Sequence, residues 1–461
     1  MQVPKLEKQI GIEVYATRSA GIGGIIRESV EDFVVEEVLV DGSKAQTKAS
    51  ESCADRQVLG CTTTKTRYLL CTVVKRNWDT LVAIKNIAKQ LHIEMPEIQI
   101  AGIKDAKALT AQHITIENAS PEQIREIHIK DIEICPLGYL HNKLSTYYLY
   151  GNSFHLRIRA VDHSTTVVTR RIAKTVEELQ AISGMPNFFG HQRFGTTRPI
   201  THLVGKTIIK KDVEKAAMLF LAKPSTYEHP SSRRARAELW KTQDYKAALK
   251  AFPTQLRYET SMLRHLVRHS GDFSGAFRTL PFKLREMFIM AYESYLFNRF
   301  LSIRIADGLR VNTAEVGDYV VAVERSGLPM PSIHRTVDSG KLAEINNAMQ
   351  AGKLRLAIPL IGFKQYPSKG AQGEIERRVL EEEDVSPKDF RTSAMPEVSV
   401  TGRLRAAITP INDFSVEKIT PNTSRPSGND VETTFALHRG SYATTLLREI
   451  MKPRNIIKEG F

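Results

Sequence analysis

One carboxylate on a short turn is the residue of this chain that is best placed to do chemistry. Asp105 closes the run Ala101-Gly102-Ile103-Lys104-Asp105, which follows the apolar residues Ile98 and Ile100. The strand-like stretch 113–116 comes soon afterwards. A turn between two strands carries its side chains on a rigid scaffold, where catalytic residues are often found. Aspartate in such turns is commonly structural, because it hydrogen-bonds its own backbone, so the turn alone leaves both interpretations open.

The elements around this turn indicate an α+β protein. Strands are predicted at 33–39, 68–74, 98–104, 129–135 and 152–160, and helices from 79, from 120 and over 164–182. In the stretch 152–160, Phe154, Leu156 and Ile158 alternate with polar residues and fall on one face. Because strands and helices mix without a regular strand–helix–strand rhythm, we expect a mostly antiparallel sheet.

The charge of the chain points to a polyanionic partner. Its 461 residues include 65 Lys and Arg against 51 Asp and Glu, a net charge of +14, and the length is typical of two or three domains. Residues 201–250 are especially basic, with a dense spot at Ser231–Arg236. Such a run is often only a solvated face, but contact with nucleic-acid phosphates is the functional alternative.

Several protein classes are disfavoured by the sequence. The first residues lack the apolar run of a signal peptide, and no uncharged apolar stretch is long enough to span a bilayer. The four cysteines form no CxxC pair, so a zinc site is not expected. We expect reduced thiols, a cytoplasmic location, no membrane partner and no bound metal. In the absence of a zipper or a long apolar patch, a monomer without an obligatory protein partner is the default.

Five further stretches accompany the Asp105 turn in order along the chain: Arg27–Glu37, Gly151–Phe154, Pro186–Gly195, Ser294–Asn298 and Gly440–Glu449. Together they closely resemble the TruD family of tRNA pseudouridine synthases, of the archaeal and eukaryal type. The resemblance extends from about residue 20 to 451, and its motifs are long and specific.

This resemblance implies an enzyme that isomerises uridine to pseudouridine in tRNA, usually at position 13, without a metal or organic cofactor. It implies a catalytic domain of α+β type with a curved, mixed and mostly antiparallel sheet, formed by residues 1–186 and 409–461. An inserted α+β domain, known as the TRUD domain, would occupy residues 187–408. A catalytically silent RNA-binding protein or tRNA chaperone on the same fold is the alternative, and a metal-dependent RNA hydrolase would need a ligand cluster that does not stand out.

The resemblance also assigns residues. The family's catalytic aspartate falls on Asp105, which would either attack C1′ of the ribose or take a C2′ proton. Phe154 would hold the flipped base, although an ordinary core phenylalanine is its structural alternative. Asn152 would bond the base or the ribose, and Arg27 would keep Asp105 ionised.

The stretch Pro186–Gly195 supplies the remaining candidates. It mixes Asn, His, Gln and Arg with Phe and Gly, which suits either a packed turn or a cradle for the RNA backbone. We expect a mixture of the two, with RNA contacts from Asn187, His191, Gln192 and Arg193.

Overall fold

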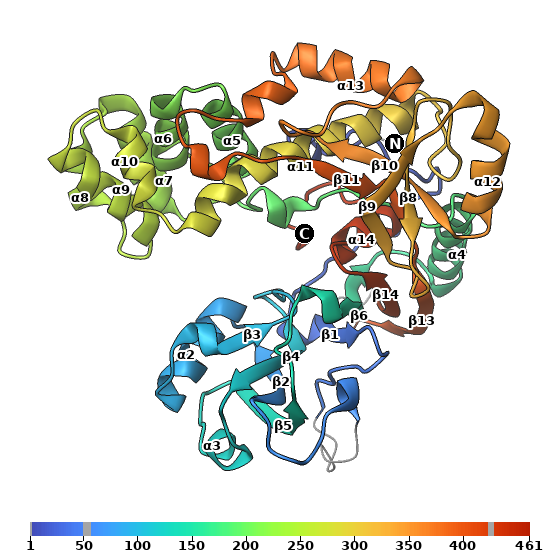
Figure 1. Ribbon diagram of the computed structural model, residues 1–461, viewed down its shortest axis with the longest axis horizontal. Coiled ribbons are helices and arrows are strands. Elements are labelled where there is room, and N and C mark those ends of the chain that lie inside the picture. Colours follow the sequence, from blue (N-terminus) through green and yellow to red (C-terminus); the bar gives the residue numbers. More distant parts are fainter. Residues whose placement is uncertain (1, 49–56, 423–427) are drawn as a thin grey trace.

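The computed structural model describes residues 2–48, 57–422 and 428–461. It shows an α+β protein built around two separate sheets, which Figure 1 displays one below the other. Within the described residues the larger sheet has eight strands. In spatial order they are β13 (Asn412–Pro421), β14 (Asn429–His438), β6 (Leu149–Val161), β1 (Phe33–Leu39), β4 (Leu109–Glu117), β2 (Tyr68–Arg76) and β5 (Ile132–Leu140), with β3 (Ile98–Ile100) paired to β4. Of the strand pairs described, β1–β4 alone is parallel, so the large sheet is mixed.

Local sequence explains most of these elements. Phe154, Leu156 and Ile158 are all buried on β6, as their alternation predicts. Asp79 caps α2 (Thr80–Leu91) by accepting from the backbone N–H groups of Leu81 and Val82. The predicted strand 98–104 ends early, because the chain leaves the sheet after Ile100 to form the loop that carries Asp105.

Helices pack against the large sheet, and their apolar side chains form two hydrophobic cores with those of the strands. Strands β1, β6 and β14 pack with α4 (Thr165–Ala181) and α14 (Ala443–Met451), while β2, β3 and β4 pack with α2 and α3 (Pro121–Arg125). Helix α3 begins after Ser120, as expected, and a capping box joins Ser120 to Gln123. One core therefore lies along the β14-β6-β1 half of the sheet and the other along the β4-β2 half.

The second sheet lies in a different part of the molecule. Its strands are β11 (Arg403–Ala406), β10 (Leu354–Leu360), β8 (Tyr319–Val323) and β9 (Pro329–Thr336), and it is accompanied by α11 (Phe282–Ala306), α12 (Leu342–Gln350) and α13 (Gly370–Glu382). The helices α5 (Thr201–Ile209), α6 (Val213–Ala222), α7 (Pro230–Thr242), α8 (Tyr245–Ala251), α9 (Arg257–Arg268) and α10 (Phe273–Arg278) form a lobe beside it. The long helix α11 runs from this lobe toward the second sheet (Figure 1).

The chain leaves the large sheet for the second sheet and returns to it along adjacent segments. The two-residue strand β7 (Met185–Pro186) pairs antiparallel with β12 (Ile408–Thr409). The outgoing segment therefore lies directly beside the returning segment, although more than two hundred residues separate them in the sequence.

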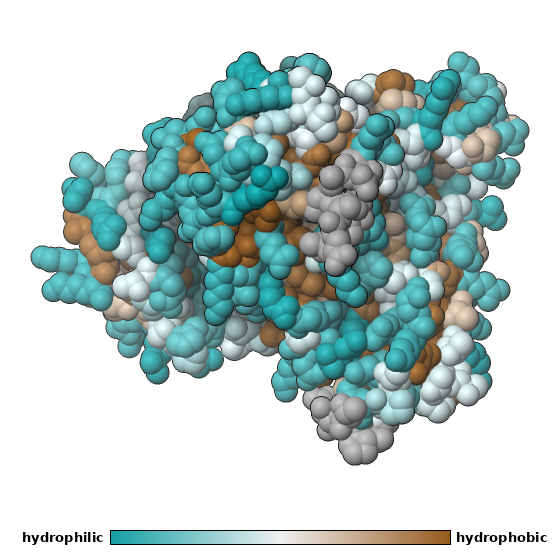
Figure 2. All heavy atoms as spheres, turned by 90° about the horizontal axis from the view of Figure 1, so that it is seen from below, coloured by the Kyte–Doolittle hydropathy of each residue, from teal (hydrophilic) through white to brown (hydrophobic). Residues whose placement is uncertain are grey.

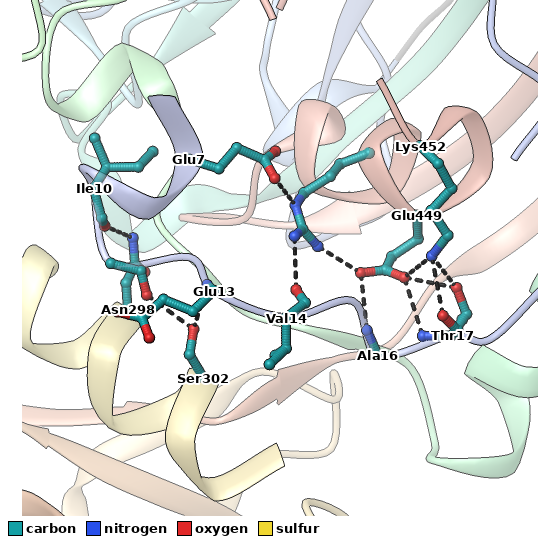
Figure 3. A network of polar contacts seen from close by, with 12 residues as sticks. Glu7, Ile10, Glu13, Val14, Ala16, Thr17, Asn298, Ser302, Glu449 and Lys452 are labelled. Atoms are coloured by element: carbon teal, nitrogen blue, oxygen red, sulfur yellow. Dashed lines mark hydrogen bonds and ion pairs between the residues drawn. The ribbon is translucent and has the colours of Figure 1, made fainter. Parts of the chain in front are cut away.

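The N-terminal segment ties the two parts together (Figure 3). On one side, Asn298 of α11 donates a 2.9 Å hydrogen bond to the Ile10 carbonyl. On the other side, Glu449 of α14 accepts hydrogen bonds from the backbone N–H groups of Ala16 and Thr17. Helix α1 (Lys5–Lys8) adds a buried ion pair, in which Arg448 Nε lies 2.8 Å from Glu7 Oε2. Removing one partner of such a buried pair typically costs about 3–5 kcal/mol of stability.

The cysteines and the helices also bear on two expectations from the sequence, that the thiols are reduced and that the chain does not span a membrane. Cys135 on β5 is disulfide-bonded, so the expectation of reduced thiols is wrong there. None of the helices in the described part of the chain combines the length and the apolar character needed to cross a bilayer.

Candidate active site

Asp105 lies in the loop between β3 and β4, and its side chain is held from two directions. Its Oδ1 is 3.1 Å from Arg27 Nη2 and also accepts a short hydrogen bond from Gln192 Nε2. The carboxylate remains 23% exposed. Among the described residues no donor bonds Oδ2, so one oxygen of the carboxylate is left for another group.

Buried lysines hold the backbone of this loop. Lys75 Nζ, at the end of β2, donates to the carbonyl oxygens of Asp105 at 2.8 Å and of Trp78 at 2.7 Å. Burial lowers the pKa of Lys75 to about 8, although Asp105 favours its charged form. Lys104 forms a 2.7 Å ion pair with the fully buried Glu37 of β1. The backbone position of Asp105 is therefore fixed by the buried side chains of Lys75 and Lys104.

Arg27 approaches Asp105 in an unusual backbone conformation. Its φ is +58°, which side-chain-bearing residues rarely adopt. Its Nη1 donates to the carbonyl of Gly460 at 3.2 Å, and its guanidinium carbon lies 3.9 Å from the centre of the Phe33 ring. Burial lowers the pKa of Arg27, and the negative charge of Asp105 opposes that effect.

A cavity of about 470 Å³ opens beside the carboxylate. Its lining includes Asp105, Arg27, Asn152, Phe154, Gln192 and the loop of residues 440–444. Its volume lies in the range of pockets that bind small molecules or single nucleotides. The loop after β14 thus completes a wall to which β1, β6 and the β3–β4 loop contribute.

Asn152 lines this cavity and carries a buried acceptor without a partner among the described residues. It lies on β6 opposite Glu37 of β1 and Leu437 of β14. Its Oδ1 is buried and accepts no hydrogen bond from the described residues. Leaving such an acceptor unpaired costs about 1–3 kcal/mol, and a ligand that donates an N–H or O–H would recover that loss.

Phe154 belongs both to the cavity wall and to the core. It is 3% exposed and stacks on Phe435, with ring centroids 5.2 Å apart and planes inclined by 28°. The Phe33 ring meets it edge-on at 6.4 Å. The two interpretations of this residue are therefore compatible, because one face of the aromatic cluster borders the cavity.

The candidates of the stretch 186–195 separate in the structure. Gln192, in the 3₁₀ turn η6 (His191–Arg193), lines the cavity and contacts Asp105. Asn187 is buried, and its Oδ1 accepts from Arg405 at 2.6 Å. His191 is buried, and burial together with Arg448 lowers its pKa to about 3. Arg193 donates from Nε to Ser294 Oγ at 3.2 Å.

These contacts give the turn two sides. Successive residues of a 3₁₀ helix point about 120° apart, so only the middle residue of η6 reaches Asp105. Asn187, His191 and Arg193 do not line the described cavities. The hydrogen bonds of Asn187 and Arg193 favour support of the turn over contact with a ligand, whereas both ring nitrogens of His191 are buried without a partner among the described residues. Their RNA-binding role stays a prediction.

A second cavity of about 660 Å³ also borders Asp105. Arg27, Asp105 and Gln192 border both cavities, and the second also includes Lys107 and Lys458. The carboxylate is therefore shared by two adjoining cavities, and the second of them contains further cations. This arrangement suits a nucleotide whose backbone continues past the site.

The basic spot of α7 is smaller than the sequence suggests. Arg233 and Arg234 are exposed, but Arg236 is buried and pairs with Glu259 at 2.6 Å and with Glu228 at 3.2 Å. Arg236 is therefore not available for phosphate contact. Figure 2 views the whole molecule from below. Hydrophilic side chains cover much of the face that it shows, and hydrophobic residues lie between them near its middle.

Lys75 is a site residue that the sequence analysis missed. The predicted strand 68–74 ends one residue before Lys75, whereas β2 continues to Arg76. Its position in the strand period is the signal. Lys75 follows the buried residues Cys71 and Val73 at two-residue steps and therefore falls on the same face. A lysine in register with core positions indicates a buried amine that needs acceptors.

Fold and site together define an α+β protein with a carboxylate-centred cavity and strong positive charge. The family model for tRNA pseudouridine synthase D (TruD) matches residues 9–450. The chain belongs to the TruD family of tRNA pseudouridine synthases. Its activity is accordingly the conversion of uridine to pseudouridine in tRNA.

Relatives support this membership over nearly the whole length. The chain is 37% identical over 451 residues to a protein of Methanococcoides burtonii and 38% identical over 453 residues to one of Methanosarcina barkeri, each named "Probable tRNA pseudouridine synthase D". Both matches cover 98% of each chain. A crystal structure assigned to tRNA pseudouridine synthase D (TruD) of Methanosarcina mazei is also similar, with a TM-score of 0.81 and 36% identity. It matches 99% of this chain and 100% of that one.

Proposed function

We propose that Asp105 is the catalytic carboxylate and that it acts on a uridine flipped into the 470 Å³ cavity, at position 13 of tRNA. The observation that carries this proposal is the state of the carboxylate. Its Oδ1 is occupied by Arg27 and Gln192, while Oδ2 receives no hydrogen bond from the described residues. A partly exposed, positioned carboxylate with one available oxygen is suited to act on a ribose.

The reaction requires that the bond between N1 of uracil and C1′ breaks and that a bond between C5 and C1′ forms. N1 gains one proton and C5 loses one, so no redox partner is needed. Asp105 either attacks C1′ or takes the C2′ proton, and both routes need it ionised. Arg27 holds the carboxylate in place through a charge-assisted hydrogen bond.

The other cavity residues would hold the base. Target bases leave the helical stack before such chemistry and are gripped by stacking and by hydrogen bonds to their edges. The unpaired Oδ1 of Asn152 would accept a hydrogen bond from the uracil N3–H or a ribose hydroxyl. Phe154 would supply a flat wall backed by Phe435, which keeps the ring from moving away.

The domain organisation follows the same proposal. Residues 1–186 and 409–461 would form the pseudouridine-synthase catalytic domain, with its curved sheet, and residues 187–408 the inserted domain. The pairing of β7 with β12 supports these boundaries, because the chain leaves and returns at adjacent residues.

We expect the enzyme to act as a monomer in the cytoplasm, where it meets tRNA.

Mapping pseudouridine on defined transcripts tests this function. The protein is incubated with an unmodified tRNA transcript and with the same transcript carrying cytidine at position 13. Carbodiimide treatment followed by primer extension should give one enzyme-dependent stop, one nucleotide 3′ of position 13, in the first transcript only. A stop elsewhere would refute the assigned position, and no stop in either transcript would refute the activity.

A further inference from the structure

Two apolar side chains stand out in the solvent next to the first cavity. Tyr147 is 82% exposed and Ile103 is 65% exposed, the highest values among the large hydrophobic residues that the structure describes. Ile103 lines the cavity, and Tyr147 follows Thr146, which also lines it. Single exposed hydrophobic residues are ordinary, but the two most exposed ones flank one cavity.

The segments that carry these residues lie against each other. A Cβ added at Gly102 would lie 3.0 Å from Cδ2 of Leu149. Gly102 directly precedes Ile103, and Leu149 begins β6 immediately after the 3₁₀ turn η5 (Thr146–Tyr148) that contains Tyr147. Ile103 and Tyr147 therefore belong to one continuous rim and not to two unrelated surfaces.

The backbone of the rim is rigid even though its side chains are exposed. Arg439 Nη1 donates to the carbonyl oxygens of Thr146 at 2.7 Å, Leu149 at 3.1 Å and Tyr147 at 3.4 Å. On the other segment, Lys104 is fixed by its buried ion pair with Glu37. Exposed apolar groups on a fixed backbone lose little further freedom when a ligand covers them.

We propose that Ile103 and Tyr147 contact the nucleobases that flank the target uridine in tRNA, and that this contact replaces the stacking lost when the uridine leaves its helix. The inference rests on the proposed role of the cavity. Proteins that displace bases commonly place apolar or aromatic side chains against the neighbours left behind. Such a rim would favour the flipped state without touching the reacting atoms.

The surroundings favour RNA over a second protein. The rim is continuous with the cavity, and the adjoining second cavity includes the cations Arg27, Lys107 and Lys458. The chain carries a net charge of +14. A protein partner, including a second copy of this chain, is the competing occupant that the experiment must detect.

Matched alanine variants test the proposal. Tyr147→Ala and Ile103→Ala are compared with Tyr366→Ala and Ile333→Ala, whose side chains are each 56% exposed and do not line the described cavities. The substrate is a tRNA with 2-aminopurine next to the target position. Fluorescence reports unstacking of that neighbour, single-turnover rate reports chemistry, and melting temperature reports folding.

Loss of one stacking contact should lower the single-turnover rate of Tyr147→Ala about tenfold and change the 2-aminopurine signal, while Tyr147→Phe stays near wild type. The melting temperatures should match those of the controls. Rates and fluorescence equal to those of the control variants would overturn the inference. It would also be overturned if the wild-type protein forms a dimer and Tyr147→Ala abolishes that dimer but keeps normal turnover. Asp105→Asn is measured alongside: if it remains active, the cavity assignment itself fails, independently of the rim.

Discussion

Arg27 pairs with Asp105 from a backbone conformation that its own side chain disfavours. The ion pair measures 3.1 Å and the φ of Arg27 is +58°. A non-glycine residue in this region costs about 1–2 kcal/mol, which neighbouring contacts must offset. Ile25 exchanges two 2.8 Å backbone hydrogen bonds with Arg159, and Ile26 donates to the Glu459 carbonyl at 3.0 Å. The strain therefore lies where the proposed catalytic group is positioned.

Gly460 is predicted to control this pair, because its carbonyl accepts a hydrogen bond from Arg27 and its backbone packs against Ile26. Its φ is +87°, and a Cβ there would lie 1.9 Å from the carbonyl oxygen of Ile26. Gly460→Ala should displace Arg27 and lower the single-turnover rate by about tenfold to 100-fold, because small misplacements of catalytic groups are costly. Affinity for tRNA should change little.

Gly308 provides the control for this experiment. Its φ is +77°, but nothing lies within 4 Å of an added Cβ. Gly308→Ala bears only the cost of its positive φ, so it should lose a small amount of stability and keep its rate. If Gly460→Ala and Gly308→Ala are equally active, the contact between Gly460 and Ile26 does not position Arg27.

Phe154 needs a variant that separates its two roles. Phe154→Ala would leave a hole in the core worth about 3–5 kcal/mol, so a lower melting temperature would accompany any loss of rate. Phe154→Leu keeps the site apolar at a cost of about 1.5 kcal/mol or less, yet removes the flat ring. We expect a melting temperature near wild type and a single-turnover rate about tenfold lower. A wild-type rate for the leucine variant would mean that the ring serves the core alone.

Arg233 and Arg234 are expected to contribute to tRNA affinity through α7, where both are exposed. Reversing both to Glu should weaken binding and make it less dependent on salt, because fewer counterions are released. Reversing the exposed residues Arg325 and Lys341 changes the net charge equally and serves as the control. Equal effects of the two double variants would indicate a general charge effect without local contact.

The sequence carried strong information about individual elements and little about their convergence. Periodicity located β1, β2, β6, α2 and α4, and Gly102 with Asp105 marked the turn. The cavity joins residues near positions 27, 105, 152, 192 and 440. Their meeting depends on the strand order β14-β6-β1-β4, which arises from long-range pairing that no local pattern reveals.

Side-chain direction was the other property that the sequence could not supply. Arg236 belongs to the same basic run as Arg233 and Arg234, but it pairs with the buried Glu259 and the half-buried Glu228. His191, Gln192 and Arg193 are consecutive, yet only Gln192 reaches Asp105. In short polar runs the orientation is set by tertiary packing, so composition alone does not separate ligand contacts from internal supports.

The most direct test of the account is Asp105→Asn, which keeps the shape of the side chain and removes its charge. Turnover is measured by tritium release from tRNA containing [5-³H]uridine, because C5 loses its hydrogen in the reaction. We predict turnover below about one-hundredth of wild type, with tRNA affinity and melting temperature nearly unchanged. Turnover above that level in a purified, folded variant would contradict the central claim that Asp105 performs the chemistry.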